Sequence, residues 1–579
     1  MTFPVFIFDV FRSFLPLHNP IGFGAADFLE FTLAALLVAF ILAWPAVEPY
    51  ARRFAHNTVL CMLLLAALPV ALRLALLANH PVPAPEIYDE FSHLLVADTL
   101  RHFRFANPPH ALNRFFETFF VLQDPTYSSI YPIGQGLWLA IGRAIFRTPW
   151  AGVLIATAAF CSLTYWMLRA WISAGWALVG GLLAVIQFGP LNLWMNSYWG
   201  GAVAGASGCL VFGALPRIQA QHQQGDAPSR TRRWRWAPAL LLGAGLAMHI
   251  LTRPYESIFL LLSVLLFFAP EPSRLRALAP TAGLVLVALA ITALQNRAVT
   301  HSWTTLPYQL SQYQYGVPAA LTIQPNVTPH RELTPEQQLD YKMQRAFHGE
   351  GTDTLATYFE RLEYRVRYYR FFFLAPLYLA IPAFLVAVRR YRYAYAWVLV
   401  TAALFALGVN LFPAFQFHYI ASLSCLFILM AVAGLDQIAR IRIRGSAVGV
   451  QAANIIVFLC GATFLFWYAM HLFDDTSVSR SMRAYEVWDA IDHRGQDPRA
   501  AVNAQLAQAP GKQLVFVRYW PQHIFQNEWV WNEADIDGAR VVWARDLGAV
   551  ENASLIQYYR DRTVWLLEPD FRPPRLSRY

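Results

Sequence analysis

Long apolar segments separated by short polar ones recur along most of the chain. Many are close to the roughly 20 residues that a helix needs to cross a bilayer. They occupy residues 27–47, 58–79, 132–146, 150–170, 175–190, 192–216, 237–251, 256–270, 279–297, 371–388, 394–412, 419–435 and 447–472. This pattern predicts a polytopic α-helical membrane protein with about 12 or 13 transmembrane helices. It excludes an outer-membrane barrel, whose segments are short and alternate in hydrophobicity.

Arginine clusters between the apolar segments predict which loops face the cytoplasm. They lie at residues 52–53, 230–235, 274–276, 389–392 and 440–444. Successive crossings alternate in direction, so the hydrophilic stretches 80–131 and 298–370 and the C-terminus should lie on the other side. The charge pattern thus predicts a multi-pass membrane protein with an extracytoplasmic C-terminus.

Residues 132–216 contain four apolar segments, and this number conflicts with the charge pattern. Four crossings would place the basic loop 217–235 outside, against the positive-inside rule. An odd number of segments must therefore cross. We expect residues 175–190 to be broken or re-entrant, although the sequence leaves the choice among the four open.

The chain changes character at residue 473, after which charge is denser and apolar runs are shorter. Residues 513–519, 540–545 and 563–568 read as strands, and residues 552–562 read as a helix capped by Asn552. We therefore expect a transmembrane domain, 1–472, and a small extracytoplasmic α/β domain, 473–579. The tail has no glycine-rich phosphate loop, so nucleotide binding is not expected there.

The amino-acid composition excludes further classes of protein. With 57% hydrophobic and only 14% charged residues, the chain differs from a cytosolic enzyme. The net charge of +9 comes from short clusters beside apolar segments, so nucleic acid is not an expected partner. All five cysteines lie inside apolar segments, which excludes a disulfide framework.

An acidic pair opens the first outer stretch. Asp89 and Glu90 begin a segment, 86–100, whose apolar residues recur at helical spacing, so we expect a helix lying along the membrane surface. A carboxylate placed there is able to act as general base on an acceptor hydroxyl. The alternative is an ordinary helix start, since acids in a first turn are stabilised by the helix dipole.

The residues that follow strengthen the functional interpretation. Tyr131-Pro132 and then, after five intervening residues, Trp138 lead into the next apolar segment. An outer Asp-Glu pair followed by this pattern resembles the GT-C membrane glycosyltransferases. The closest branch comprises protein O-mannosyltransferases, aminoarabinose transferases and lipopolysaccharide core galacturonosyltransferases. The resemblance covers about residues 50–300, and the motif Met195–Gly201 is similar to one in uncharacterised bacterial proteins.

The resemblance implies a GT-C-like fold and an inverting transfer of a sugar from a polyprenyl-phosphate donor. The acceptor would be an extracytoplasmic lipid, glycan or protein, and the base would be Asp89, with Glu90 beside it. Two features depart from the family. Tyr131-Pro-Ile stands where Lys-Pro-Pro is usual, which puts a phosphate-contacting lysine in doubt, and an extra apolar segment precedes the usual first one.

A polyprenyl-phosphate donor needs a cation for its phosphate, and Arg253 is the candidate. It stands between apolar segments 237–251 and 256–270, directly before Pro254, which breaks a helix. We expect a helical hairpin with Arg253 at its outer turn, where the guanidinium fork would match phosphate oxygens. The alternative is that Arg253 forms a structural ion pair with Glu256, which is itself a candidate contact.

Four more residues are candidates for contacts to the donor phosphate or sugar. They are Tyr131, Asn196, Tyr198 and His418. Asn196 and Tyr198 belong to a polar and aromatic patch, but such residues also serve as ordinary anchors at a membrane interface. His418 is a lone histidine at an outer turn and is equally expected in a structural role. The aromatic and amide-rich stretch 298–370 would be either a lid over the site or packing for the C-terminal domain.

No cofactor is expected. Asp89, Glu90 and His93 have a spacing that would bring them to one face of a helix and allow a divalent metal, but a metal-independent reaction is favoured. The expected partners are the lipid-linked sugar donor and membrane lipids. The main rival function is a transporter or flippase of lipid-linked sugars, which would favour inverted repeats and polar residues at the bilayer centre. A scaffold for envelope assembly is a third class, and it requires neither the acidic pair nor Arg253.

Overall fold

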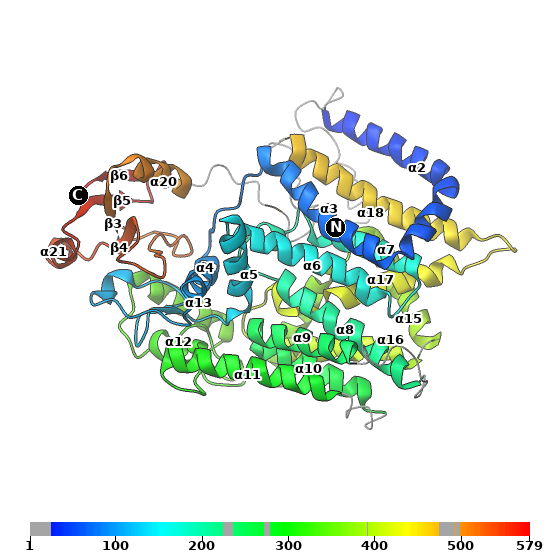
Figure 1. The fold of residues 1–579 in the computed structure, drawn as a ribbon, viewed down its shortest axis with the longest axis horizontal. Helices are drawn as coiled ribbons and strands as arrows, with labels where there is room; N and C mark the ends of the chain where they lie inside the picture. Colours follow the sequence, from blue (N-terminus) through cyan, green and yellow to red (C-terminus); the bar gives the residue numbers. More distant parts are fainter. Residues whose placement is uncertain (1–24, 224–235, 271–277, 391, 474–490, 492–497) are drawn as a thin grey trace.

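The computed structural model describes residues 25–223, 236–270, 278–390, 392–473, 491 and 498–579. Within these residues the chain forms a helical bundle with a small sheet at one end (Figure 1). The first part of the chain contains α2 (Ala25–Ala55), α3 (Thr58–Ala75), η1 (Leu76–Ala78), α4 (Tyr88–Arg101), η2 (Asn113–Phe116), β1 (Val121–Leu122), β2 (Ser128–Ser129), α5 (Ile133–Phe146), α6 (Trp150–Leu168), α7 (Ala174–Phe188), η3 (Leu193–Met195) and α8 (Ala202–Gln223).

The second part contains the remaining membrane helices and the helices of the second outer stretch. It comprises α9 (Ala237–Thr252), α10 (Pro254–Phe268), α11 (Ala279–Thr300), α12 (Pro307–Tyr315), α13 (Pro335–His348), α14 (Leu355–Val366), η6 (Arg367–Phe372), η7 (Ala375–Leu379), α15 (Ala380–Arg390), α16 (Arg392–Val409), η8 (Phe417–Leu423), α17 (Ser424–Ala439) and α18 (Val448–Phe473).

The apolar helices confirm the predicted class, a polytopic helical membrane protein. Among the described residues, six helices are long and apolar enough to cross a membrane. A further pair, Leu355–Phe372 with Ala375–Arg390, is bent by 113° and counts as a seventh candidate. Five shorter apolar helices accompany them: Ile133–Phe146, Ala174–Phe188, Ala237–Thr252, Pro254–Phe268 and Tyr393–Val409.

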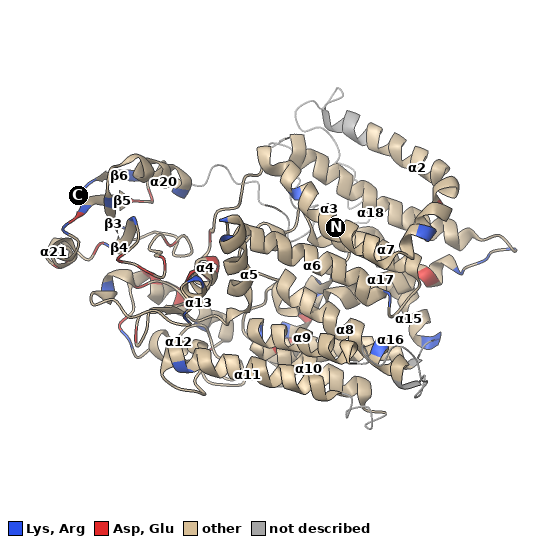
Figure 2. Ribbon diagram, viewed as in Figure 1, with Lys and Arg blue, Asp and Glu red and all other residues tan. Residues whose placement is uncertain are grey.

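Charge is concentrated at the two ends of the bundle, and the helices between them are mostly uncharged (Figure 2). Arg52 and Arg53 lie in the last turn of α2, and Arg389 and Arg390 lie in the last turn of α15, at the end remote from the sheet. The sheet marks the opposite end, which is called the sheet end below. The basic clusters 230–235 and 274–276 lie outside the described residues.

The helix α5 does not cross the bundle. Near its start, a Cβ on Gly134 would lie 2.1 Å from Thr252 Oγ1, at the end of α9. Near its finish, Arg143 forms ion pairs with Asp98 of α4 (3.2 Å) and with Glu533 of the C-terminal region (2.8 Å). Both ends of α5 therefore lie at the sheet end, and Figure 1 shows α5 set across the direction of α6.

This arrangement resolves the conflict in residues 132–216 and corrects one expectation. The helix α7 is continuous over Ala174–Phe188, so the expectation of a broken segment at 175–190 was wrong. The break follows that helix instead, where Gly200 and Gly201 adopt positive φ of 99° and 116°. With α5 excluded, three helices remain in this region: α6, which is long and apolar enough to cross a membrane, the shorter α7, and α8. Three crossings would agree with the arginine pattern.

A second correction concerns α4, which begins and ends close to the expected helix. It does not lie along a membrane surface, because both of its sides are covered. A Cβ on Gly136 of α5 would lie 2.3 Å from Val96 Cγ1, and Phe91 stacks on Trp531 of the C-terminal region at 4.7 Å. Its helical periodicity therefore reflects packing against protein on two sides.

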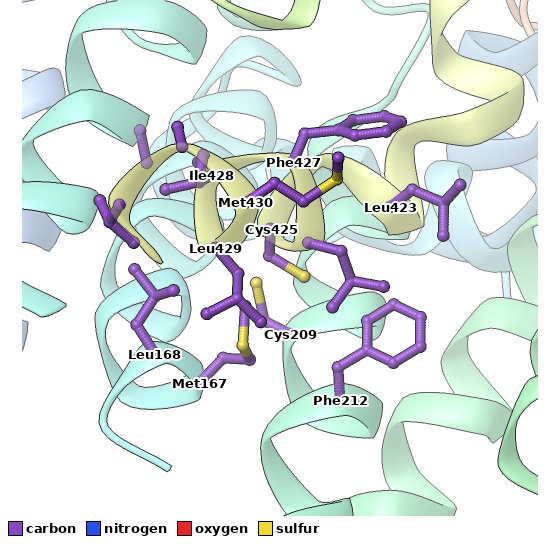
Figure 3. Packing of buried hydrophobic residues seen from close by; sticks show 14 of the residues in the cluster. Met167, Leu168, Cys209, Phe212, Leu423, Cys425, Phe427, Ile428, Leu429 and Met430 are labelled. Carbon is purple, nitrogen blue, oxygen red and sulfur yellow. The ribbon is translucent and has the colours of Figure 1, made fainter. Parts of the chain in front are cut away.

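The core of the bundle is built around α17. The span Phe417–Ala439 has 94% of its most apolar window buried, more than any other candidate span. Figure 3 shows Cys425 and Leu429 of this helix directed towards Cys209 of α8 and Met167 of α6. The approach of α8 is close, since a Cβ on Gly208 would lie 2.1 Å from the carbonyl oxygen of Ser422. Only glycine fits at that contact.

The C-terminal region forms the expected α/β unit. Its elements are α20 (Pro498–Gln508), β3 (Lys512–Val517), β4 (Val541–Arg545), α21 (Ala549–Tyr558), β5 (Arg562–Glu568) and β6 (Arg575–Arg578). The strand order is β4-β3-β5-β6, with β3 parallel to both neighbours and β6 antiparallel to β5. The helix α21 begins three residues before Asn552, which is therefore not its cap; Asn552 instead bonds Asp546 and the Leu547 amide.

Thiol labelling tests the placement of α5. The five native cysteines are all buried, so they give little background. Cysteines in place of the exposed residues Arg147 and Glu332 should react with an impermeant reagent from the same side of the membrane. Ser173→Cys, at the turn between α6 and α7, should react only from the other side. If Arg147→Cys reacts together with Ser173→Cys, then α5 crosses the membrane.

Candidate functional site

A cluster of polar and aromatic side chains lies at the sheet end of the bundle. It is built where α4, the start of α5, the segment between α7 and α8, the α9–α10 junction and η8 meet. The sequence-predicted candidates lie in or next to this cluster, although separated by as many as 329 positions, from Asp89 to His418. Some of these candidate side chains face the inside of the cluster, and others form contacts that support it.

Asp89 lies in the first turn of α4 and is half-buried. Tyr131 donates its hydroxyl hydrogen bond to Asp89 Oδ1. Burial raises the pKa of Asp89 to about 6, against the opposing effects of hydrogen bonds from Tyr131 and Trp199 and of the Arg253 charge. A carboxylate with this pKa is largely ionised at pH 7 and still accepts a proton well, which suits a general base.

Glu90 is oriented differently and is almost fully buried. Its Oε2 accepts the backbone N–H groups of Glu86 (2.8 Å) and Ile87 (3.2 Å), and its Oε1 accepts that of Tyr198 (2.8 Å). Burial raises its pKa to about 7, and the three N–H groups oppose that shift. Both oxygens of Glu90 are thus engaged in capping α4 and in tying it to the segment between α7 and α8.

His93 lies one turn beyond Asp89 and stacks on the Tyr131 ring, with centroids 4.2 Å apart. It is buried, and neither ring nitrogen has a hydrogen-bond partner among the described residues. Burial and, to a smaller extent, the nearby Arg253 charge together lower its pKa to about 3, so the ring is neutral at pH 7. A buried histidine with both nitrogens unsatisfied is unusual and marks a place where a polar ligand would bind.

Asn196 and Tyr198 support the cluster. Asn196 accepts a hydrogen bond from Arg73 Nε and donates to the carbonyl oxygens of Pro190 (2.9 Å) and Asn192 (2.7 Å). The hydroxyl of Tyr198 donates to the Pro83 carbonyl at 2.9 Å. Their polar groups therefore bond to the protein itself.

Arg73 is the buried arginine within the second apolar segment. Besides its bond to Asn196, it donates to the carbonyl oxygens of His80 (2.9 Å) and Pro81 (3.0 Å). Its guanidinium also lies over the Trp150 ring, 4.9 Å from the centroid. It faces protein, as its position in an apolar helix requires.

Arg253 lies where α9 ends and α10 begins, at the turn of the expected hairpin. Its guanidinium lies over the Tyr419 ring, 5.3 Å from the centroid. Among the described residues, the Arg253 side chain makes no hydrogen bond or ion pair. The Glu256 carboxylate is within range of the electrostatic attraction of Arg253 but does not form an ion pair with it. The structure therefore does not contain the Arg253–Glu256 ion pair that was the structural alternative.

His418 and two further aromatic residues complete the cluster. His418 is buried in η8 with its ring 4.9 Å from that of Trp199. Burial raises the pKa of Tyr308, in α12, far above its usual range, and the charges of Arg253 and Asp89 also act on it. Tyr308 belongs to the aromatic stretch 298–370 of the sequence analysis, but its position near Tyr419 and Arg253 could be found only from the fold.

Asp340 of α13 is a residue that the sequence did not indicate. It is fully buried, bonds Gln344 at 3.2 Å, and is 3.5 Å from the Tyr88 hydroxyl. Burial raises its pKa to about 7, and the charge of Asp89 contributes to that shift. The second outer stretch thus brings a second carboxylate close to Asp89. No motif around Asp340 distinguishes it from an exposed acid.

Metal ligation is not supported by the geometry of these groups. In the described part of the chain, no three His, Cys, Asp or Glu side chains are arranged to hold a metal ion. Of the three residues whose spacing suggested a metal, Glu90 has both oxygens occupied by backbone N–H groups. A metal-independent reaction remains a prediction.

Comparison with solved structures gives similarities of fold. ArnT from Cupriavidus metallidurans in the apo state has 13% identity and a TM-score of 0.46, covering 87% of this chain and 92% of that chain. The same protein bound to undecaprenyl phosphate has 12% identity, the same coverages and a TM-score of 0.46.

An archaeal oligosaccharyltransferase, AglB from Archaeoglobus fulgidus in complex with an inhibitory peptide and a dolichol-phosphate, is also similar. It has 11% identity and a TM-score of 0.39, covering 88% of this chain and 69% of that chain. No family model and no curated protein matches the chain. With identities and TM-scores at this level, the function of the chain must be argued from its own residues.

The two acids of α4 should differ in how much stability an amide substitution costs, because only Glu90 has both oxygens bound to backbone N–H groups. Glu90→Gln removes an acceptor from backbone N–H groups that are buried, so at pH 8 it should lower the unfolding free energy by about 1–3 kcal/mol. Asp89→Asn should lower it much less, because the amide oxygen that remains still accepts the hydrogen bond of the Tyr131 hydroxyl. Thermal unfolding in detergent measures both, and equal losses would contradict this division of roles.

Proposed function

We propose that this protein is an inverting glycosyltransferase that moves a sugar from a polyprenyl-phosphate donor to an extracytoplasmic acceptor. The observation that carries the proposal is the meeting of Asp89, a half-buried carboxylate with a pKa of about 6, with Arg253, whose guanidinium has no ion-pair partner among the described residues. One group removes a proton and the other stabilises a phosphate, which are the two requirements of this transfer.

The reaction follows from these two groups. An acceptor hydroxyl attacks the anomeric carbon, and Asp89 takes the hydroxyl proton as the new glycosidic bond forms. The bond between the sugar and the phosphate breaks on the opposite face, so the anomeric configuration inverts. Negative charge grows on the departing phosphate, and the Arg253 guanidinium stabilises it by charge-assisted hydrogen bonds.

The surroundings of Arg253 suit a lipid-linked donor. Directly after it, α10 presents Ile258, Leu262 and Leu265 at helical spacing, each more than 40% exposed. An apolar stripe therefore leads away from the guanidinium along a helix that borders the lipid. A polyprenyl tail can follow that stripe while its phosphate remains at the sheet end.

A transporter is less consistent with this arrangement. Asp89 and Arg253 gather at one end of the bundle, whereas a transporter places its substrate site near the bilayer midplane between two repeats. The proposed orientation, with the sheet end facing the periplasm of a bacterial inner membrane, agrees with the arginines at the opposite end.

The proposal is tested with the purified full-length protein in nanodiscs. Undecaprenyl-phosphate-linked sugars of several kinds are supplied with a bacterial envelope fraction as acceptor, and released undecaprenyl phosphate and sugar transfer are measured. Transfer with inversion supports the function. Movement of the intact donor across the bilayer without release of undecaprenyl phosphate would instead show a flippase.

Asp89 should determine both the rate and its dependence on pH. Asp89→Asn should lower transfer by at least about 10²-fold, the lower range for general-base catalysis. In the wild-type protein kcat/KM should fall by about tenfold per pH unit below pH about 6, because the protonated carboxyl cannot accept a proton. Normal turnover by Asp89→Asn, or a flat profile between pH 5 and 7, would exclude Asp89 as the base.

Arg253 should determine donor binding in a graded manner. Arg253→Lys keeps the charge but loses the bidentate fork, so it should be impaired, and Arg253→Ala should be nearly inactive. Binding of undecaprenyl phosphate should weaken in the same order. Arg297→Ala, on the exposed outer end of α11, is the matched control and should bind normally. Unchanged affinity in Arg253→Ala would place the phosphate elsewhere.

A further inference from the structure

One segment of the C-terminal region, Glu528–Ala534, lies along the helix that carries Asp89. The Trp531 ring stacks on Phe91 with centroids 4.7 Å apart and planes within 5° of parallel. Two turns further on, the backbone N–H of Ala534 donates to Asp98 Oδ2 at 2.8 Å. The segment therefore contacts α4 near both of its ends.

The segment is itself firmly held. The Trp531 indole N–H donates to the Glu528 carbonyl at 3.1 Å. The Glu528 carboxylate binds Arg545, which is buried at the end of β4. Arg545 also donates to the Glu117 carbonyl (2.6 Å) and forms an ion pair with Glu336 (2.7 Å). One guanidinium thus connects the sheet with both outer stretches, and the sheet cannot shift without breaking buried charge contacts.

The geometry of α4 makes this contact relevant to Asp89. Phe91 is two residues beyond Asp89, in the same turn of helix as the site. On its other side, α4 is held by the Glu90 bond to the Tyr198 amide (2.8 Å) and by the close approach of Gly136 to Val96. On the side of the C-terminal region, Trp531 stacks on Phe91, and the Arg499 guanidinium lies over the same ring, 4.6 Å from its centroid. The first turn of α4 is therefore held between the membrane helices and the C-terminal region.

We propose that Trp531 is a positioning residue for the base. Through this residue, the C-terminal region sets the orientation and the solvent exposure of Asp89. It acts through Phe91 and does not touch the reacting groups. The role of Asp89 as base rests on the proposed function. The packing of Trp531 on α4 does not, and the two are separable by experiment.

The chain offers a matched control for the test. Trp531 and Trp565 are 8% and 9% exposed, and each donates its indole N–H within the C-terminal region. Only Trp531 stacks on α4, since Trp565 lies in the sheet. Trp531→Leu and Trp565→Leu should therefore lose comparable thermal stability, but only the first should affect Asp89.

The readout is the modification of Asp89 by dicyclohexylcarbodiimide, which reacts with protonated carboxyl groups, followed by mass spectrometry against pH in the full-length protein. The wild-type midpoint should lie at pH about 6. Trp531→Leu should lower it by about half a unit or more, because water reaching Asp89 reduces the desolvation that raises its pKa. Trp565→Leu should leave it unchanged. An unchanged midpoint in Trp531→Leu, or an equal change in both variants, overturns the proposal.

Activity separates this proposal from the proposed function. Trp531→Leu should lower kcat by about tenfold or more with an unchanged KM for the lipid-linked donor, since a small displacement of a catalytic group is costly. Trp531→Phe, which keeps a stacking ring, should restore most of the rate. If Trp531→Leu does not fold, Phe91→Leu makes the same test from the other partner. A shifted midpoint together with full activity of Asp89→Asn would support the positioning and overturn only the assignment of Asp89 as base.

Discussion

The close approach of α5 to both α4 and α9 is the constraint on which the site depends. A Cβ on Gly134 would lie 2.1 Å from Thr252, and one on Gly136 would lie 2.3 Å from Val96. Between them, Gln135 donates to the Tyr198 carbonyl at 3.1 Å. One turn of helix thus joins the helix that carries the base, the helix that ends at Arg253 and the segment between α7 and α8. Any side chain larger than hydrogen at the two glycines would separate these parts.

The polar side chains around the cluster are of two kinds, which differ in whether protein atoms pair with their hydrogen-bonding groups. Arg73, Glu90 and Asn196 are buried, and each has its polar atoms paired with protein, as buried polar groups must be if the fold is to be stable. His93 has two unsatisfied nitrogens, and Arg253 has only a ring beneath it among the described residues. The first set holds the backbone, and the second set has hydrogen-bonding capacity left for a ligand. Unsatisfied groups of this kind cost stability, which is typical of a functional site.

The sequence predicted those features that depend on local pattern. Apolar length identified the helices, and the Pro254 break placed Arg253 at a hairpin turn. The sequence-based prediction was wrong where tertiary contacts determine how a helix is placed. The apolar character of residues 133–146 does not reveal that α5 lies across the bundle, because an apolar helix buried among other helices resembles one that crosses lipid. Likewise α4 has an apolar periodicity because it packs on the C-terminal region, which begins hundreds of residues later. Asp340 had no sequence signal at all, since only its burial makes it unusual.

The two proposed roles are coupled through charge. Burial raises the pKa of Asp89, and the Arg253 charge is among the effects that oppose it. If Arg253 binds the donor phosphate as proposed, the phosphate charge offsets the charge of the guanidinium. The guanidinium then no longer lowers the pKa of Asp89. Asp89 would then hold a proton more strongly when the donor is bound than when the site is empty. The base would be strongest in the complex in which the acceptor hydroxyl has to be deprotonated, and the protein would achieve this with two fixed side chains and without a conformational change.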